Sequence, residues 1–147
     1  MSGDAEGEES KPPLRSVHTT SFPAILERLG ASVLVTTYQA GKLVVLRPER
    51  GTLNTHFRNF SKPMGLAVDG DRLAIGTALE VWEFHNIPAL ARKLEPPGSH
   101  DACFLPRRGF TTGDVQVHEM AWVGPELWFV NTRFSCLCTL DGLHSFV

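Results

Sequence analysis

Short apolar runs recur along most of the chain, and turn-forming residues such as Gly, Asn and Asp separate them. The clearest series is residues 117–140, VHEMAWVGPELWFVNTRFSCLCTL, in which three apolar segments are separated by Gly-Pro and Asn-Thr-Arg. Short runs rich in β-branched and aromatic residues, bounded by turn signals, predict β-strands. We therefore predict an all-β fold organised around this stretch.

The pattern of this stretch also occurs earlier in the chain. Residues 65–77, GLAVDGDRLAIGT, align without a gap with residues 119–131, EMAWVGPELWFVN, each position lying 54 residues after its counterpart (65 to 119). A partial third copy, residues 34–46, aligns with residues 128–140. Self-similarity at this spacing indicates a repeat fold in which each unit buries a face on the next. The alternative is that all apolar hairpins look alike, which an ungapped match over a whole hairpin disfavours.

The remaining segments predict a few further elements. Ser21 is placed to cap a short helix with an apolar face, which ends at Gly30. Strands are also predicted at residues 32–38, 42–46 and 52–60, with a polar turn at 48–51. A second short helix, capped by Asn86, is predicted over residues 86–94. Residues 95–113 show no regular pattern and are predicted to form a long loop.

Composition narrows the class of protein. The chain has 147 residues, of which 42% are hydrophobic and 20% charged, as in an ordinary globular domain. Its net charge of -2 gives no reason to expect nucleic acid or an anionic membrane as a partner, and no apolar run is long enough to span a bilayer. Three cysteines without framework spacing favour a reducing cytoplasm. Residues 1–16 are predicted to be a disordered acidic tail before one domain, residues 17–147.

Residues 60–75, FSKPMGLAVDGDRLAI, resemble the opening of a blade in six-bladed β-propellers of the NHL and gluconolactonase type. Such blades begin Pro-x-Gly-apolar-Ala-Val-Asp and continue into an apolar second strand. More closely, the chain from about residue 21 resembles the N-terminal portion of an uncharacterised bacterial family, catalogued as a conserved hypothetical protein with a domain-of-unknown-function label. The residues that carry this closer match are 36–43, 100–107, 118–122 and 131–137.

The resemblance implies an incomplete β-propeller with about two to two and a half blades of antiparallel sheet and a short N-terminal helix. Members of the family are typically much longer than this chain. The resemblance therefore implies that residues 17–147 are a propeller truncated at its C-terminus, and that the full-length propeller is monomeric. Blades with open edges are expected to associate or to remain loosely folded.

In such folds the residues that enter each innermost strand, and those that link second to third strands, face one mouth of the central channel. His118 and Glu119 lie at such an entry and are the candidate catalytic pair, since either could act as a general base on water. Candidate ligand-binding residues at the links are Gln39, Thr77, Asn131 and Arg133. Glu119 and Asn131 are also candidate ligands of a divalent cation, the one cofactor that the pattern suggests. The alternative is that His118 hydrogen-bonds within the sheet and Glu119 pairs with an Arg.

Two further groups of residues are candidates for chemistry. His100 and Asp101, on the long loop, are candidate ligand-binding residues that could close over the mouth as a lid, or a solvent-exposed polar pair. Cys136 and Cys138 share one face of a strand and are predicted to be buried free thiols rather than zinc ligands. The three tryptophans lie within strands and are predicted to pack between sheets.

These features favour a ligand- or protein-binding module whose partner is an unknown small molecule or protein. The alternative is a metal-dependent hydrolase, similar to lactonases, with its site at the same mouth. A third possibility is a remnant without independent activity. A stoichiometric divalent ion in the full-length protein would favour the enzyme, and its absence the binding module.

Overall fold

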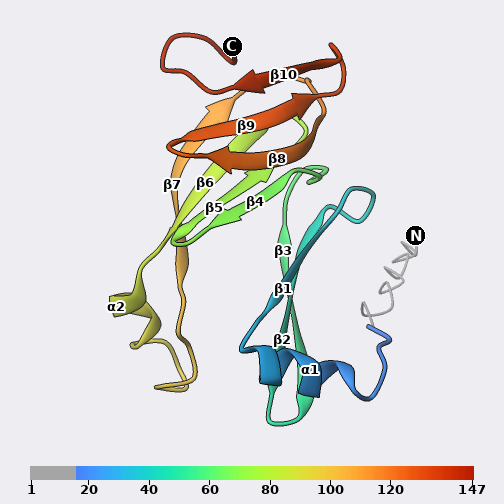
Figure 1. Ribbon diagram of the computed structural model, residues 1–147, viewed down its shortest axis with the longest axis vertical. Helices are drawn as coiled ribbons and strands as arrows, with labels where there is room; N and C mark the ends of the chain where they lie inside the picture. Colours follow the sequence, from blue (N-terminus) through green and yellow to red (C-terminus); the bar gives the residue numbers. More distant parts are fainter. Residues whose placement is uncertain (1–15) are drawn as a thin grey trace, which may run out of the picture.

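The computed structural model describes residues 16–147, and within them the predicted all-β fold is confirmed. Among the described residues, ten strands form three antiparallel sheets. The sheets follow one another along the chain (Figure 1). The sheet with β1–β3 and helix α1 lies at one end of the molecule, and the sheet with β8–β10 lies at the other. The tail predicted for residues 1–16 lies outside the described residues, except for Ser16.

The first sheet contains three strands in the order β1 (Val33–Thr37), β2 (Lys42–Glu49) and β3 (Thr52–Asn59). Strand β2 is longer than predicted, because the turn that follows needs only Arg50 and Gly51. Both residues have positive φ angles, 51° and 76°, which is the backbone of a two-residue turn that matches the twist of the flanking strands. Strand β3 lies where a strand was predicted at residues 52–60 and pairs with β2 along its whole length.

The second sheet contains four strands in the order β4 (Leu66–Asp69), β5 (Arg72–Gly76), β6 (Glu80–Asn86) and β7 (Phe104–Thr111). The prediction of an irregular loop over residues 95–113 was wrong for its second half, which forms β7. This strand pairs with β6 from Asn86–Phe104 to Glu80–Thr111, with a bulge next to Phe84. Most of its residues are exposed, so backbone pairing rather than apolar packing stabilises this outer strand. Its sequence therefore shows no alternation of apolar and polar residues.

The third sheet is the stretch that dominated the sequence pattern, and its three predicted strands are confirmed. They are β8 (Val117–Val123), β9 (Glu126–Asn131) and β10 (Cys136–Thr139). At the free edge of β10, Val147 and Thr139 exchange both backbone hydrogen bonds, at 2.8 and 2.9 Å. Val147 thus pairs with β10 at this one position.

Helix α1 lies between Ser21 and Gly30 as predicted, and helix α2 is shorter than predicted. Helix α1 (Phe22–Leu29) begins after Ser21, whose side chain makes no capping hydrogen bond, and ends at Gly30 with a φ of 58°. It packs on β2 and β3 and buries Pro23 and Leu26, whereas Leu29 stays exposed. Helix α2 (Pro88–Ala91) has one turn, and its N-cap position is Ile87, since Asn86 still belongs to β6.

The aligned segments of the chain have the same strand register. Leu66 pairs with Ile75 in the second sheet, and Met120 with Phe129, each 54 residues later, in the third. The partial third copy behaves in the same way: Leu34 pairs with Val45, and Trp128 with Thr139, each 94 residues later (34 to 128). The link from β5 to β6 is two residues shorter than its counterparts, since Gly76 pairs with Val81 and the equivalent Val130 pairs with Leu137.

Consecutive sheets pack face to face through two apolar clusters. Leu43 of the first sheet is buried with Leu73 and Ile75 of the second. A second cluster joins the other face of the second sheet, including Ala74 and Val81, to Leu127, Phe129 and Cys138 of the third. The second sheet therefore uses one face toward the first sheet and the opposite face toward the third, as side-chain alternation along strands permits.

Two neighbouring glycines let the second and third sheets approach closely. Gly65 and Gly76 are joined by a backbone hydrogen bond of 2.9 Å and face Val117 and Met120 of β8. A Cβ atom on Gly76 would lie 2.4 Å from Cγ1 of Val117, and one on Gly65 would lie 2.4 Å from Sδ of Met120. Neither glycine needs a positive φ, so the requirement is space for the packing of β8.

Candidate functional site

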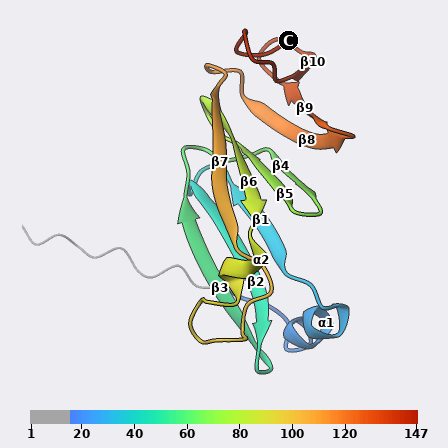
Figure 2. The ribbon, with the colours of Figure 1, turned by 90° about the vertical axis from the view of Figure 1, so that its left-hand side faces the viewer.

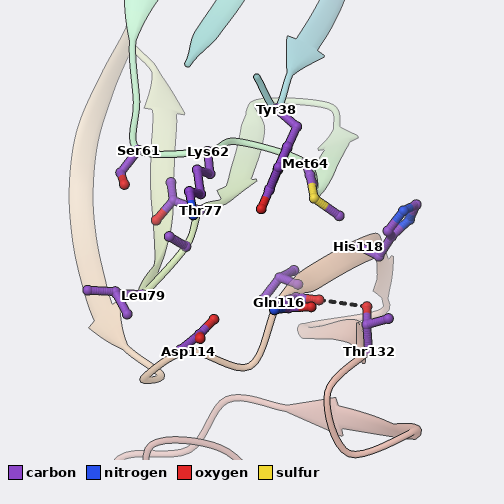
Figure 3. A pocket seen from close by; sticks show the side chains of 12 residues that line it. Tyr38, Ser61, Lys62, Met64, Thr77, Leu79, Asp114, Gln116, His118 and Thr132 are labelled. Atoms are coloured by element: carbon purple, nitrogen blue, oxygen red, sulfur yellow. Dashed lines mark hydrogen bonds between the residues drawn. The ribbon is translucent and has the colours of Figure 1, made fainter. Parts of the chain in front are cut away.

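A hollow of about 450 Å³ lies where the three sheets meet at one end of their strands (Figure 3). Its walls come from the segments that enter β4 and β8 and from the links β1–β2, β5–β6 and β9–β10. The residues that line it are Tyr38, Ser61, Lys62, Met64, Thr77, Ala78, Leu79, Asp114, Gln116, Val117, His118 and Thr132. These are the two kinds of segment from which the sequence predicted a site.

Two residues that enter the inner strands have an unusual backbone. Lys62 and Gln116, 54 positions apart, have φ angles of 48° and 52°, a left-handed conformation that non-glycine residues adopt at a cost of about 1 kcal/mol or more. The Gln116 carbonyl oxygen accepts a 2.7 Å hydrogen bond from Thr132 Oγ1, drawn in Figure 3. The Lys62 ammonium lies 5.6 Å from the centre of the Tyr38 ring, within the range of a cation–π contact. The segments that enter β4 and β8 thus both present polar groups to the hollow.

The links between second and third strands are held by one side chain each. Thr77 Oγ1 donates to the Glu80 carbonyl at 2.9 Å and accepts from the Glu80 N–H at 3.2 Å. Thr37 makes the same pair of bonds with Lys42, at 3.1 and 3.2 Å. At the equivalent position in the third sheet, Asn131 Oδ1 accepts from the Phe134 N–H at 3.1 Å, and its side-chain amide lies 3.8 Å from Cys138 Sγ. These residues shape the links around the hollow by satisfying backbone groups.

The predicted pair His118 and Glu119 is only half directed at the hollow. His118 lines it, whereas Glu119 is not among the lining residues, and the strand register shifts in this part of β8, between Val117 and Met120. His118 Nδ1 still lies 3.2 Å from Glu119 Oε1, and both side chains are exposed. The structure thus brings the two together but offers only His118 to a molecule in the hollow.

The candidate residues at the links have different places. Thr77 lines the hollow, while Asn131 is fully buried beneath it and its side-chain oxygen is already used by a backbone N–H. Arg133 forms an ion pair with Asp114 at the edge of the hollow, with both side chains about half exposed. Gln39 is exposed and does not line the hollow.

His100 and Asp101 lie at the opposite end of the second sheet. The loop that carries them joins β6 to β7, and in an antiparallel sheet this connection is at the other end from the β5–β6 link (Figure 1). His100 Nδ1 lies 3.1 Å from a guanidinium nitrogen of Arg47, and its Nε2 lies 3.2 Å from the Glu95 carbonyl oxygen. The structure therefore does not place these two residues as a lid.

The residues that sequence reasoning did not select are Tyr38, Lys62, Asp114 and Gln116. None of the four is a His or a Glu, but the alignment of the two hairpins contains a signal for two of them. When the alignment of residues 65–77 with residues 119–131 is extended three residues upstream, Lys62 aligns with Gln116. These two residues precede β4 and β8. Their shared left-handed backbone could not be read from residue type, since neither is Gly or Asn.

A metal site was predicted at Glu119 and Asn131. Within residues 16–147, no three His, Cys, Asp or Glu side chains lie close enough together to hold a metal ion. Glu119 does not line the hollow, and the Asn131 side-chain oxygen already accepts a backbone N–H, so this pair does not form a donor set by itself. The metal-dependent hydrolase remains a prediction.

Cys136 and Cys138 share a face of β10, with their sulfur atoms 3.6 Å apart. Cys138 is buried as predicted, but Cys136 is exposed, because it lies at the start of β10 beside the open link. Together with Cys103 they are free thiols.

No helix among residues 16–147 is both long and apolar enough to cross a membrane.

The family described as Domain of unknown function (DUF4915) matches residues 20–147, which is nearly all of the described chain. The chain belongs to this family. The DUF4915 match covers all three sheets, the helices and every residue that lines the hollow. No curated protein matches the chain.

Proposed function

We propose that the three sheets are successive blades of a β-propeller, and that the protein is a binding module which holds a small polar molecule in the hollow. The blade interpretation is supported by the shared register of the aligned hairpins and by the four-stranded meander of the second sheet. It is also supported by face-to-face packing of each sheet on the next. In that arrangement the hollow belongs to one end of the axis around which the blades are arranged.

One observation carries the binding proposal: equivalent positions of three sheets converge on one hollow, and two of them keep a costly left-handed backbone. Residues held in sparsely populated backbone regions cluster at ligand sites, because the surrounding structure must hold them there. Lys62 and Gln116 are such residues, and both line the hollow. The fold thus keeps a destabilising backbone conformation where polar groups gather, which is typical of a binding site.

The polar groups define the class of ligand. Lys62 supplies a cation that pairs with no carboxylate within 4 Å among the described residues. Tyr38 and Thr132 supply hydroxyl groups, and the Asp114 carboxylate is already paired with Arg133. This set suits a small hydroxylated acid, whose anionic group would lie near Lys62 and whose hydroxyl groups would bond to Tyr38 and Thr132.

The proposal is tested by NMR titration of the ¹⁵N-labelled protein with D-gluconate, with D-glucose as the uncharged comparison. We expect gluconate to shift the amide signals of residues in the 61–64 and 114–118 segments, and Lys62→Met to weaken binding at least about tenfold, which is the loss of one charge-assisted hydrogen bond. Lys93→Met, which changes an exposed Lys in the segment after α2, is the matched control and should bind as the wild type does. Signals at the hollow that do not move, or equal affinities for the two variants, would contradict the proposal.

A further inference from the structure

We propose that a groove between the first and second sheets binds a small organic cation that carries a methylated ammonium group. The groove has a volume of about 330 Å³, which is within the range of small-ligand sites. Its walls come from the end of β3 and the segment after it, from the β5–β6 link, and from β6 and β7. The residues that line it are Asn59, Phe60, Ser61, Thr77, Glu80, Trp82, Phe84 and Pro106. Both walls therefore belong to neighbouring sheets of the described chain.

The groove adjoins the hollow but offers a different charge to a ligand. Ser61 and Thr77, labelled in Figure 3, line both of them. In the hollow the charge left without an ion pair is the Lys62 cation, whereas Glu80 is the one charged residue that lines the groove. The proposal for the groove therefore does not rest on the ligand proposed for the hollow.

Trp82 is held from two sides. Its indole N–H donates a 3.0 Å hydrogen bond to Glu80 Oε2. Its six-membered ring lies over Gly109 of β7, which is opposite Trp82 in the strand register. A Cβ atom on Gly109 would lie 3.5 or 3.6 Å from three atoms of that ring, so one ring face covers β7 at this point. Because Trp82 also lines the groove, its other face is available to a ligand.

Two more aromatic rings complete the apolar part of the groove. Phe60 and Phe84 pack edge to face, with ring centres 6.2 Å apart and an angle of 78° between the ring planes. Both also pack on the cluster of Leu43 and Ile75 between the two sheets, which fixes their positions. The faces of aromatic rings carry negative partial charge and attract cations, Trp most strongly. Three such rings beside one carboxylate favour a cation with apolar substituents.

The Glu80 carboxylate is free to pair with such a cation. Within residues 16–147 no Lys, Arg or His nitrogen lies within 4 Å of it. The Lys42 ammonium donates instead to Asn59 Oδ1, and Lys42 is not a lining residue. A negative charge that no neighbour in the described chain neutralises, in a partly apolar groove, is a recognition element for a positive ligand.

The remaining hydrogen-bonding groups favour a methylated ammonium over a primary one. The Thr77 hydroxyl is used by the Glu80 backbone, and Asn59 Oδ1 accepts from Lys42. Glu80 Oε2 accepts from the Trp82 indole, which leaves Glu80 Oε1 and the Ser61 hydroxyl as the acceptors without a partner in the described chain. A primary ammonium has three N–H donors to satisfy, whereas a quaternary one has none and is recognised by aromatic faces and a nearby negative charge.

The test is NMR titration of the ¹⁵N-labelled protein with choline, followed at the indole N–H signals of Trp82 and Trp128. The comparison is the neutral analogue dimethylbutanol, in which a carbon atom replaces the ammonium nitrogen. We expect choline to shift the Trp82 signal alone and to bind at least about fivefold more tightly than the analogue. Equal affinities, equal shifts of both indole signals, or a Trp82 signal that does not move would overturn the proposal.

Glu80→Gln removes the charge and keeps an oxygen that can accept the Trp82 N–H. It should weaken choline binding about fivefold and leave the affinity for dimethylbutanol unchanged, whereas a change in the shape of the groove would weaken both. Glu126→Gln is the matched control, because Glu126 accepts the Trp128 indole N–H at 3.2 Å in the same way but does not line the groove. It should bind choline as the wild type does. Equal losses in the two variants would contradict a role for Glu80.

The amide signals separate the groove from the hollow. Residues 114–118 include lining residues of the hollow and none of the groove, so choline should leave their signals in place. Movement there instead of at residues 80–84 would put choline in the hollow and overturn the proposal. Circular dichroism establishes that each variant is folded. The comparison of choline with its neutral analogue uses the unchanged protein, so it decides the proposal even if Glu80→Gln does not fold.

Discussion

At the scale of single residues, equivalent positions in the three sheets solve the same backbone problem with different side chains. The hydroxyl groups of Thr37 and Thr77 and the amide of Asn131 each satisfy backbone groups at the link that follows. Ser135 has a φ of 53° where the equivalent Gly41 has 61°. The sequence identified Thr77 and Asn131 as polar residues at links, but residue type alone could not distinguish ligand binding from support of the backbone.

The two cysteines of β10 are predicted to differ in reactivity. Burial, together with the hydrogen bond to Cys136, raises the pKa of the Cys138 thiol, and only the thiolate reacts with alkylating agents. Cys136 is exposed, so we expect iodoacetamide to modify it well before Cys138 in the folded protein. Tryptic mass spectrometry over time measures both rates. Raising the pH above neutral should increase the Cys138 rate, because a larger fraction of this thiol is then ionised.

Cys136→Ser is the control for this cysteine prediction. It removes the fast site without changing the burial of Cys138, which should remain slow in the native protein and become fast in urea. Equal labelling rates for the two native thiols would show that β10 opens as readily at Cys138 as at Cys136.

At the scale of elements, strands with one covered face were predictable and the outer strand was not. In β9 the buried residues alternate with partly or fully exposed ones, and this pattern gave its position and register. In β7, Arg107 and Arg108 follow Pro106 in an exposed strand that backbone pairing with β6 stabilises. A strand stabilised by backbone pairing does not need alternating apolar residues. Residues 104–111 lack that alternation and therefore resembled a loop.

The contact between β5 and β8 depends on the absence of a side chain at Gly76. We predict that Gly76→Ala destabilises the protein by about 1–3 kcal/mol, the usual cost of overpacking. The new Cβ would lie 2.4 Å from Cγ1 and 2.9 Å from Cβ of Val117, a β-branched side chain that has few alternative rotamers. Gly65→Ala should cost less, since its nearest atoms belong to the flexible Met120. Urea unfolding measures both.

Gly109→Ala is the matched control for Gly76→Ala. Gly109 also lies in the second sheet, but a Cβ there would meet its nearest atom, in Trp82, at 3.5 Å, an ordinary van der Waals distance. Its effect should stay within about 0.5 kcal/mol of zero. If Gly76→Ala were as mild as this control, β8 would not be in close contact with β5 in solution.

At the scale of the whole molecule, the order of sheets and the place of the hollow were predictable because the hairpins align in sequence. Equivalent links come to one end of consecutive sheets, so His118, Thr77 and Thr132 meet there although they are far apart in the chain. The position of His100 was not predictable in the same way. Its end of the sheet depends on whether residues 104–111 form a fourth strand, and that strand was missed.

Arg72 joins the second and third sheets, and its loss should weaken the whole molecule. Its guanidinium lies 4.1 Å from the centre of the Trp122 ring and donates a 2.9 Å hydrogen bond to the Gly124 carbonyl, while Asp69 pairs with it within its own sheet. A partly exposed cation–π contact and a charged hydrogen bond predict that Arg72→Met lowers the free energy of unfolding by about 1–3 kcal/mol. Urea unfolding followed by tryptophan fluorescence measures this loss.

Two further variants separate the role of Arg72 from that of positive charge alone. Arg72→Lys keeps the charge but loses the planar group that stacks on Trp122 and reaches Gly124, so it should recover less than half of the lost stability. Arg107→Met removes an exposed charge from β7 and should change stability by less than about 0.5 kcal/mol. If Arg72→Lys were as stable as the wild type, charge would suffice and the contact with Trp122 would not hold the two sheets together. If it behaves as expected, the packing of consecutive sheets depends on side chains at their edges as well as on the apolar clusters between them.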